Sequence, residues 1–276
     1  MGRFTGVLLA TDYDDTLYDR HYTISRENRE AIDGFLREGG LFTVSTGRSL
    51  RNFSIQMERE RLPLNAPAIL TNGAVIHDFS TGETLRETAL PAAAAEVLAQ
   101  VCAAFPDVGF GAYRGEDVYT FRANAATQWH LAHCSLTGLP RESIQEMPGP
   151  WLKVILQHEE PARLEEVRDW MLPRWGGTYE IGFSNPYLLE VTAGGADKGG
   201  GVLWVARRLG VKPEDIYCVG NGMNDLAMLK VSAVPFAPAD CYRELKDWGA
   251  VILPPCNENT VAALIRALED RYPAGE

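Results

Sequence analysis

A short apolar run near the start of the chain leads directly into a cluster of carboxylates. Residues 7–11 have the composition of a buried strand, and Asp12, Asp14, Asp15 and Thr16 follow in the same segment. Side chains two apart on an extended chain share a face, so Asp12 and Asp14 can converge at the end of this strand. Crowded acids are costly unless a cation or a reaction needs them. An exposed acidic turn would not explain the buried-looking run before them, so the segment indicates a functional site.

Strand-like and helix-like segments alternate through the first third of the chain. Ser25 is a suitable N-cap for a helix over residues 26–37, and Gly39-Gly40 would end it. Strands are predicted at residues 41–45 and 68–71, with a helix ending near residue 60 between them. Short apolar runs separated by amphipathic helices are typical of a parallel sheet covered on both faces.

The pattern changes between about residues 84 and 184, where several strands pair without a helix between each and helices are predicted at 92–105, 125–136 and 161–172. From Leu188 the alternation resumes, with strands predicted at 188–192, 216–219, 231–234 and 250–253 and helices at 198–209, 225–230 and 258–270. We therefore predict an α/β protein with a three-layer, Rossmann-like parallel-sheet core made of residues 1–82 and 186–276. Residues 83–185 would form an inserted α+β domain.

Composition narrows the class of protein further. The formal net charge of −11 argues against a nucleic acid or an anionic membrane as the main partner. The five cysteines form no C-x-x-C pair, which is typical of a reduced cytosolic protein. No apolar stretch approaches the roughly 18 residues that span a bilayer, and the N-terminus does not resemble a signal peptide. We expect a soluble, cytoplasmic monomer or homodimer that acts on a small molecule.

Polar side chains follow each predicted core strand. In open α/β sheets, ligands bind at the carboxyl ends of the strands. Taken alone, Thr46 is most simply a helix N-cap, Lys198 a solvated first-turn residue, and segment 220–225 an ordinary turn. Together they place carboxylates, a hydroxyl and a lysine at successive strand ends. This combination is typical of enzymes that act on phosphate groups with the help of a divalent cation.

These motifs resemble those of the haloacid dehalogenase superfamily, in the branch of Cof-type, sugar-phosphatase-like hydrolases. The family's D-x-D-x-T motif is similar to Asp12-Tyr13-Asp14-Asp15-Thr16, and its second motif, a Ser or Thr ending the next strand, to Thr46. Its third motif is similar to Lys198, and its G-D-x-x-N-D motif to Gly220-Asn221-Gly222-Met223-Asn224-Asp225. The resemblance covers essentially the whole chain, and it implies that the inserted domain is a large α+β cap of the C2 type.

The resemblance also implies a role for each motif residue. Asp12 would be a nucleophile that forms an aspartyl-phosphate, and Asp14 would act as general acid and base. Thr46 and Lys198 would hold the transferring phosphoryl group, and Gly47, Arg48 and Asn224 would help to bind the phosphate. A Mg²⁺ cofactor would be held by Asp12, Asp14, Asn221 and Asp225.

Asn221 departs from the family pattern, which places an aspartate at this position. An amide oxygen is a legitimate but neutral ligand, so the site loses one negative charge. We therefore predict weaker Mg²⁺ binding than in relatives with the aspartate. Asn221 also motivates an alternative, a catalytically impaired protein that binds or senses a phosphorylated ligand.

The cap is expected to select the substrate, which would be a small phosphorylated metabolite, with sugar phosphates as the leading class. Pyridoxal phosphate, nucleotides and flavin mononucleotide remain alternatives. A phosphosugar mutase shares the aspartyl-phosphate and is separated from a hydrolase only by its products. A signalling receiver domain is excluded by chain length and motif order. Candidate cap residues for contacting the leaving group are Arg114, Arg122, Trp129, His130, His133 and Lys153.

Overall fold

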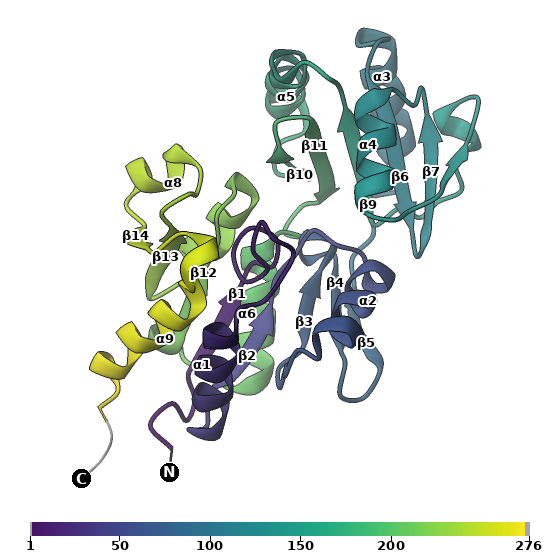
Figure 1. Ribbon diagram of the computed structural model, residues 1–276. Helices are drawn as coiled ribbons and strands as arrows, with labels where there is room; N and C mark the ends of the chain where they lie inside the picture. Colours follow the sequence, from purple (N-terminus) through teal and green to yellow (C-terminus); the bar gives the residue numbers. More distant parts are fainter. Residues whose placement is uncertain (1, 274–276) are drawn as a thin grey trace.

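Five parallel strands form the central sheet of the lower body in Figure 1, which we call the core. The computed structural model describes residues 2–273. The strand order is β14-β13-β12-β1-β2, and β1 pairs in register with β12 on one side and β2 on the other. The strands are β1 (Leu8–Thr11), β2 (Leu41–Val44), β12 (Ile216–Val219), β13 (Val234–Pro238) and β14 (Val251–Leu253).

A small antiparallel sheet continues this arrangement beyond β2. It consists of β3 (Ala68–Leu70), β4 (Val75–Asp78) and β5 (Glu83–Glu87), in that order. A parallel bridge between Ser45 and Ile69 joins β3 to the end of β2. Because β1 pairs parallel with both β2 and β12, the carboxyl ends of these three strands lie at the same edge of the core.

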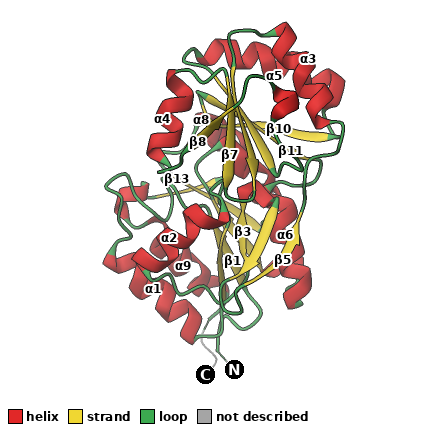
Figure 2. Cartoon of the chain, turned by 90° about the vertical axis from the view of Figure 1, so that its right-hand side faces the viewer, coloured by secondary structure: helices red, strands yellow, loops and turns green. Residues whose placement is uncertain are grey.

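Helices cover both faces of the core sheet, as Figure 2 shows for α1, α2 and α9 on one side of β1 and α6 on the other. Successive side chains of β1 point to opposite faces, so Leu9 packs in one cluster while Leu8 and Ala10 pack in the other. One face carries α1 (Arg26–Arg37), α2 (Leu50–Glu60) and α9 (Thr260–Arg271), and the other carries α6 (Lys198–Leu209), α7 (Leu226–Lys230) and α8 (Arg243–Trp248).

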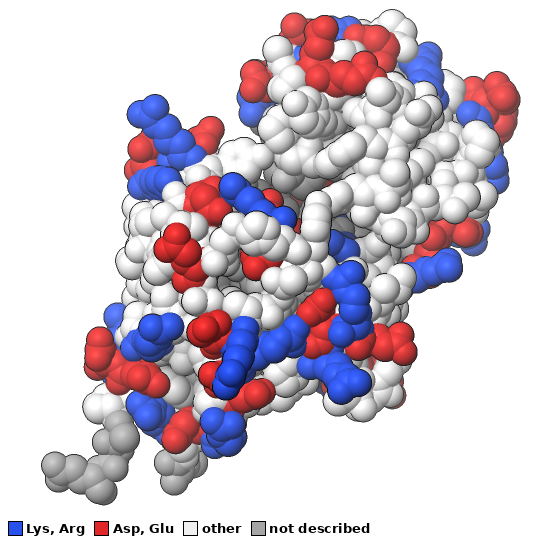
Figure 3. Space-filling view, viewed as in Figure 1, with Lys and Arg blue, Asp and Glu red and all other residues white. Residues whose placement is uncertain are grey.

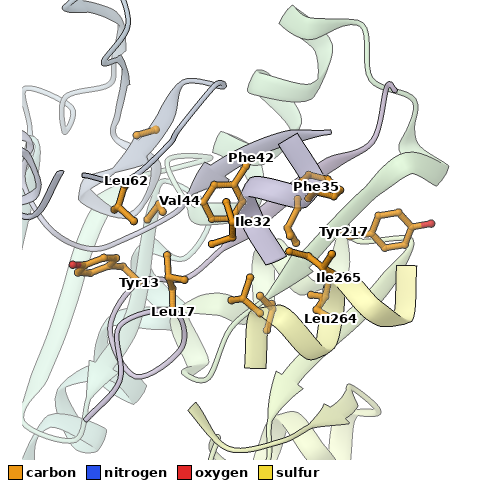
Figure 4. Packing of buried hydrophobic residues seen from close by; sticks show 14 of the residues in the cluster. Tyr13, Leu17, Ile32, Phe35, Phe42, Val44, Leu62, Tyr217, Leu264 and Ile265 are labelled. Carbon is orange, nitrogen blue, oxygen red and sulfur yellow. The ribbon is translucent and has the colours of Figure 1, made fainter. Parts of the chain in front are cut away.

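Helix α1 illustrates why the sequence forms these elements. The Ser25 side chain accepts a hydrogen bond from the Asn28 backbone N–H at 3.1 Å, which caps the helix. Ile32 and Phe35 recur at helical spacing and are buried against α9 (Figure 4). Burying each such side chain stabilises the fold by about 2 kcal/mol. The predicted bounds of this helix are confirmed.

The upper body, the cap, is built on a six-stranded sheet in the order β10-β11-β9-β6-β7-β8. Helices α3 (Ala94–Ala104) and α5 (Pro161–Trp175) cover one face, while α4 (Ala125–His133) packs on part of the other. The strands are β6 (Gly109–Arg114), β7 (Asp117–Phe121), β8 (Gly138–Pro140), β9 (Lys153–Gln157), β10 (Tyr179–Asn185) and β11 (Leu188–Ala193). The predicted fold class, a parallel α/β core with an inserted α+β domain, is confirmed.

Two strand predictions were wrong. Residues 188–192 were assigned to the core, but β11 pairs antiparallel with β9 and β10 in the cap. It was misassigned because all its side chains are buried, so its sequence reads like a parallel core strand. The strand predicted at 231–234 lies later, at Val234–Pro238. The division of the chain at residues 83 and 185 stays a prediction, and the pairings favour crossings near Thr88 and Gly194.

The sequence analysis did not predict β8, β10 or α8. Within the described residues, no helix is both long and apolar enough to cross a bilayer.

Candidate active site

A cavity of about 450 Å³ lies where the cap faces the carboxyl ends of the core strands. Eight of the predicted site residues line it, namely Asp12, Asp14, Thr46, Gly47, Arg48, Lys198, Asn221 and Asn224. Asp225, the ninth, is fully buried behind Lys198. Residues far apart in the sequence thus converge on one space, as the strand-end argument predicted.

Lys198 holds two carboxylates together at the base of the cavity. Its Nζ lies 2.6 Å from Asp12 Oδ1 and 2.5 Å from Asp225 Oδ1. Thr16 Oγ1 donates to the other oxygen of Asp12 at 3.2 Å, and the Gly222 backbone N–H donates to the other oxygen of Asp225 at 2.8 Å. Asp225 is therefore placed to orient Lys198.

The triad carries more negative than positive charge, because one ammonium serves two carboxylates. Burial, and after it the charge of Asp225, raises the pKa of Asp12 above its usual range, although Lys198 acts in the opposite direction. Burial disfavours the charged form of Lys198, but Asp12 and Asp225 outweigh it and raise the lysine pKa. The site is thus built to accept a further positive charge.

Asp14 and Arg48 form a second pair at the wall of the cavity. The Arg48 guanidinium donates to both Asp14 oxygens, at 2.6 Å and 2.8 Å, and to Asn52 Oδ1 at 2.7 Å. The guanidinium carbon of Arg48, Cζ, lies 5.3 Å from the centre of the Tyr13 ring. The bidentate geometry fixes the Asp14 carboxylate while leaving its side chain 45% exposed to the cavity.

The loop that follows β2 is held by hydrogen bonds on both sides. The Thr46 backbone N–H donates to Ile69 O at 2.8 Å, and the Asn72 N–H donates to Thr46 O at 3.0 Å. Thr46 Oγ1 accepts from the Arg48 backbone N–H at 3.2 Å, so the hydroxyl also shapes the turn. Thr46 is almost fully buried and lines the cavity.

A buried polar network joins the cap to this loop. Lys153 Nζ, on β9, lies 2.8 Å from Glu190 Oε2 on β11 and donates to Gly47 O at 2.9 Å. Asn72 Nδ2 donates to the same Glu190 oxygen at 2.8 Å. Lys153 Nζ also lies 4.9 Å from the centre of the Tyr113 ring, whose face favours a cation.

Lys153, one of the candidates for contacting the leaving group, lines the cavity, and its contacts also make it a link between cap and core. Glu190 was not predicted at all, because its strand was assigned to the core sheet. A glutamate inside a fully buried, largely apolar strand was the signal that could have identified it, since such residues are almost never buried without a partner.

The other cap candidates divide into two groups. Trp129, His130 and His133 on α4 line the cavity, and Arg114 and Arg122 are not among its lining residues. Arg122 instead donates to Cys102 O at 2.9 Å. The cavity is also lined by aromatic residues that were not predicted to contact the substrate, namely Tyr18, Tyr22 and Tyr187.

His130 is a buried imidazole in this wall and makes a hydrogen bond with Tyr113 Oη through Nε2 at 2.7 Å. Burial, with a smaller contribution from Lys153, lowers its pKa from 6.5 to about 4. Below pH 6.5 the unfolded chain therefore takes up a proton that the folded protein does not, so acid lowers stability.

We predict that His130→Gln removes this part of the acid sensitivity. Lowering the pH from 7.5 to 5 should cost the wild type about 2 kcal/mol more unfolding free energy than the variant. Urea unfolding at the two pH values measures the difference. Equal pH dependence of the two proteins would contradict a buried, neutral His130.

The predicted metal ligands do not form a ready-made cluster. Among the described residues, no group of three or more His, Cys, Asp or Glu side chains is arranged to hold a metal ion. Of the four predicted ligands, Asp14 is turned to Arg48 and Asp225 to Lys198. Asp12 and Asn221 both line the cavity.

The protein thus has a Rossmann-like α/β core with a buried Asp–Lys–Asp triad at its strand ends, beneath an α+β cap. Residues 9–265 match the haloacid dehalogenase-like hydrolase family. The chain is 24% identical over 285 residues to the 5-amino-6-(5-phospho-D-ribitylamino)uracil phosphatase YwtE of Bacillus subtilis, covering 94% of this chain and 97% of that protein.

Solved structures share the fold. A haloacid dehalogenase-like hydrolase from B. subtilis has a TM-score of 0.81 at 21% identity and covers 95% of this chain and 99% of its own. The subclass IIB sugar phosphatase BT4131 has a TM-score of 0.80 at 22% identity and covers 95% and 98%, respectively. The chain belongs to the haloacid dehalogenase-like hydrolase family. This match confirms the superfamily that the motifs predicted.

Proposed function

We propose that this protein is a Mg²⁺-dependent phosphatase of small phosphate monoesters, sugar phosphates among them, that works through an aspartyl-phosphate on Asp12. The observation that carries the proposal is the Asp12 carboxylate at the end of β1, 2.6 Å from Lys198 Nζ and in one cavity with Thr46. A nucleophile beside a fixed cation and a hydroxyl is the arrangement that phosphoryl transfer requires.

The roles of the side chains follow from their positions. An Asp12 oxygen attacks phosphorus, and the bond from phosphorus to the ester oxygen breaks. Asp14, in its protonated form, would give its proton to the departing alkoxide, and the resulting carboxylate, which Arg48 can hold, would take a proton from the water that hydrolyses the aspartyl-phosphate. Lys198 and Thr46, with Gly47, Arg48 and Asn224 around them, surround the phosphoryl oxygens and stabilise their charge.

The residues present fit a divalent cation. Asp12 and Asn221 offer oxygen donors to the cavity, with Asp14 beside them, and Asp225 would act from behind through Lys198. Burial, and after it the negative charge of Asp225, raises the pKa of Asp12, and a cation bound beside Asp12 would favour its carboxylate form. When bound, Mg²⁺ would screen the repulsion between the nucleophile and the phosphate dianion.

The proposal is tested by phosphate release from a panel of phosphorylated metabolites, with and without Mg²⁺, using Asp12→Asn as the blank. The panel includes sugar phosphates and a ribityl phosphate, since the substrate named for the YwtE relative carries its phosphate on a ribitylamino chain. We expect Mg²⁺-dependent release from at least one compound. No release above the blank from any compound would overturn the proposal.

Asn221 favours a second candidate, a protein that binds a phosphorylated ligand without turning it over. The same panel separates the two, because a pure binder shows ligand-induced thermal stabilisation but releases no phosphate. A phosphosugar mutase would convert one sugar phosphate into an isomer, which product analysis would reveal.

We predict that Asn221→Asp tightens Mg²⁺ binding. An added carboxylate at the cavity strengthens attraction for the cation, so the Mg²⁺ concentration for half-maximal activity should fall about tenfold. Titration of activity with Mg²⁺ measures it. Asn185→Asp, on the cap side of the same cavity, is the charge-matched control and should leave the midpoint near that of the wild type. Equal midpoints for Asn221→Asp and wild type would contradict a ligand role for Asn221.

A further inference from the structure

A series of aromatic rings runs from the wall of the phosphate site to the mouth of the cavity. Tyr13 stacks on Tyr18 with centroids 4.9 Å apart, and Tyr18 lies 6.1 Å from Tyr22. Tyr22 of the core faces His133 of the cap at 6.4 Å, and His133 stacks on Trp129 at 5.2 Å. The series therefore crosses from the core to helix α4 of the cap.

The outermost rings are unusually exposed for their size. Tyr22 is 61% exposed, Trp129 50% and Tyr187 43%, and all three line the cavity. Large rings left open to water around a concave site are typical of a surface that a ligand covers. They come from three separate segments, namely the loop after β1, helix α4 and the turn between β10 and β11.

The charges of the cavity indicate what kind of ligand part fits there. Every Lys and Arg among its described lining residues already has a carboxylate partner. Lys198 pairs with Asp12 and Asp225, Arg48 with Asp14, Lys153 with Glu190, and Arg20 with Asp240 at 3.2 Å. In Figure 3 the face of the cap turned to the viewer is likewise mostly uncharged. A second phosphate or a carboxylate on the leaving group would therefore find no unpaired lysine or arginine.

We propose that the outer part of the cavity, formed by Tyr22, Trp129, His133 and Tyr187, binds a flat, uncharged ring on the leaving group of a singly phosphorylated substrate. The inference rests on the proposed phosphatase function and names its substrate class. Stacking of a ring on exposed aromatic faces strengthens binding by about tenfold or more. The sugar-phosphate part and the ring would then be two parts of one substrate.

Flavin mononucleotide and D-ribitol 5-phosphate form a matched pair of substrates, because they share the ribityl phosphate and differ by the ring. We expect kcat/KM for flavin mononucleotide to exceed that for ribitol 5-phosphate by about tenfold or more. Equal values for the two compounds would overturn the proposal.

Variants of Trp129 test whether this side chain causes the preference for flavin mononucleotide. Trp129→Ala should lower the ratio of the two kcat/KM values at least about fivefold, and Trp129→Phe should restore most of it. Trp248→Ala is the matched control, since Trp248 is a 41% exposed tryptophan outside the cavity lining, and it should leave the ratio unchanged. A Trp129→Ala variant with the wild-type ratio would count against the proposal.

A binding measurement separates this inference from the proposed function. Flavin mononucleotide fluorescence should be quenched on binding to Asp12→Asn, and much less on binding to the Asp12→Asn/Trp129→Ala double variant. Quenching without phosphate release in any assay would overturn the proposed function alone. Phosphate release with equal quenching by the two variants would overturn the ring subsite alone.

A second pair of substrates tests whether the outer cavity rejects an anionic group. Fructose 6-phosphate and fructose 1,6-bisphosphate differ by one phosphate, and we expect the bisphosphate to have a kcat/KM at least about tenfold lower. An equal or higher value for the bisphosphate would show that the outer cavity accepts an anion, and would overturn the assignment to an uncharged group.

Discussion

Replacing Asp12 by Asn is expected to end turnover while leaving the protein at least as stable as the wild type. The amide has no carboxylate to attack phosphorus, so activity should fall by at least about a thousandfold, as for other enzymes that lose their nucleophile. Its oxygen can still accept from Lys198, which lies 2.6 Å from Asp12 in the wild type.

The stability follows from the sign of the pKa shift. Burial and Asp225 raise the pKa of Asp12, so its carboxylate destabilises the folded protein at neutral pH. Removing that charge should raise the free energy of unfolding by up to about 2 kcal/mol in the absence of Mg²⁺. Urea unfolding in chelator, beside steady-state assays, measures both effects.

Asp15→Asn is the control for this prediction. Asp15 stands three residues from Asp12, but its side chain is half exposed and faces Arg20 at 4.0 Å. The control should keep activity near the wild-type level. Turnover by Asp12→Asn comparable to that of Asp15→Asn would rule out Asp12 as the nucleophile.

The sequence predicted the core of the site because strand ends carry their own signals. An apolar run followed by polar residues marks where a parallel strand ends, and all such ends open at one edge of the sheet. Asp12, Thr46 and Asn221 could therefore be placed together from local patterns alone. Lys198 follows β11, an antiparallel cap strand, so only the family motif placed it correctly at this edge. The four motifs occur along the chain in the order typical of the family, and the match of residues 9–265 to the family model supports that resemblance.

The cap side of the site was less predictable, since it depends on pairing between distant strands. Glu190 contacts Lys153 because β11 pairs antiparallel with β9, and nothing local in β11 distinguishes that pairing from a parallel one. Tyr22 faces His133 only because the cap stands over the loop that follows β1. Such contacts are fixed by the tertiary arrangement and leave no periodic signal in the sequence.

Removing Lys153 should have a large effect on stability. Lys153→Met would leave Glu190, which is 7% exposed, buried with an unpaired charge, and would remove the donor to Gly47 O. Breaking a buried ion pair in this way costs about 3–5 kcal/mol. Because the loop carrying Thr46 would lose its tie to the cap, kcat/KM should also fall about tenfold to a hundredfold.

The pH dependence of this loss identifies its cause. Burial alone would raise the pKa of Glu190, but Lys153 outweighs it and lowers the pKa, so in the wild type the pair stabilises the fold above about pH 4.5. Without Lys153, burial raises the Glu190 pKa, and protonation relieves the unpaired charge as the pH falls. The destabilisation should thus shrink from pH 7.5 to pH 5, which urea unfolding at both values measures.

Two further variants decide whether the buried charge is responsible. Lys153→Met/Glu190→Gln, which removes both charges, should recover more than half of the stability lost by the single variant, a coupling that a double-mutant cycle quantifies. Arg163→Met, which breaks the exposed pair with Asp107 in the same cap, should cost under about 1 kcal/mol. Equal losses for Lys153→Met and Arg163→Met, or no recovery in the double variant, would show that Lys153 does not tie the cap to the phosphate-binding loop.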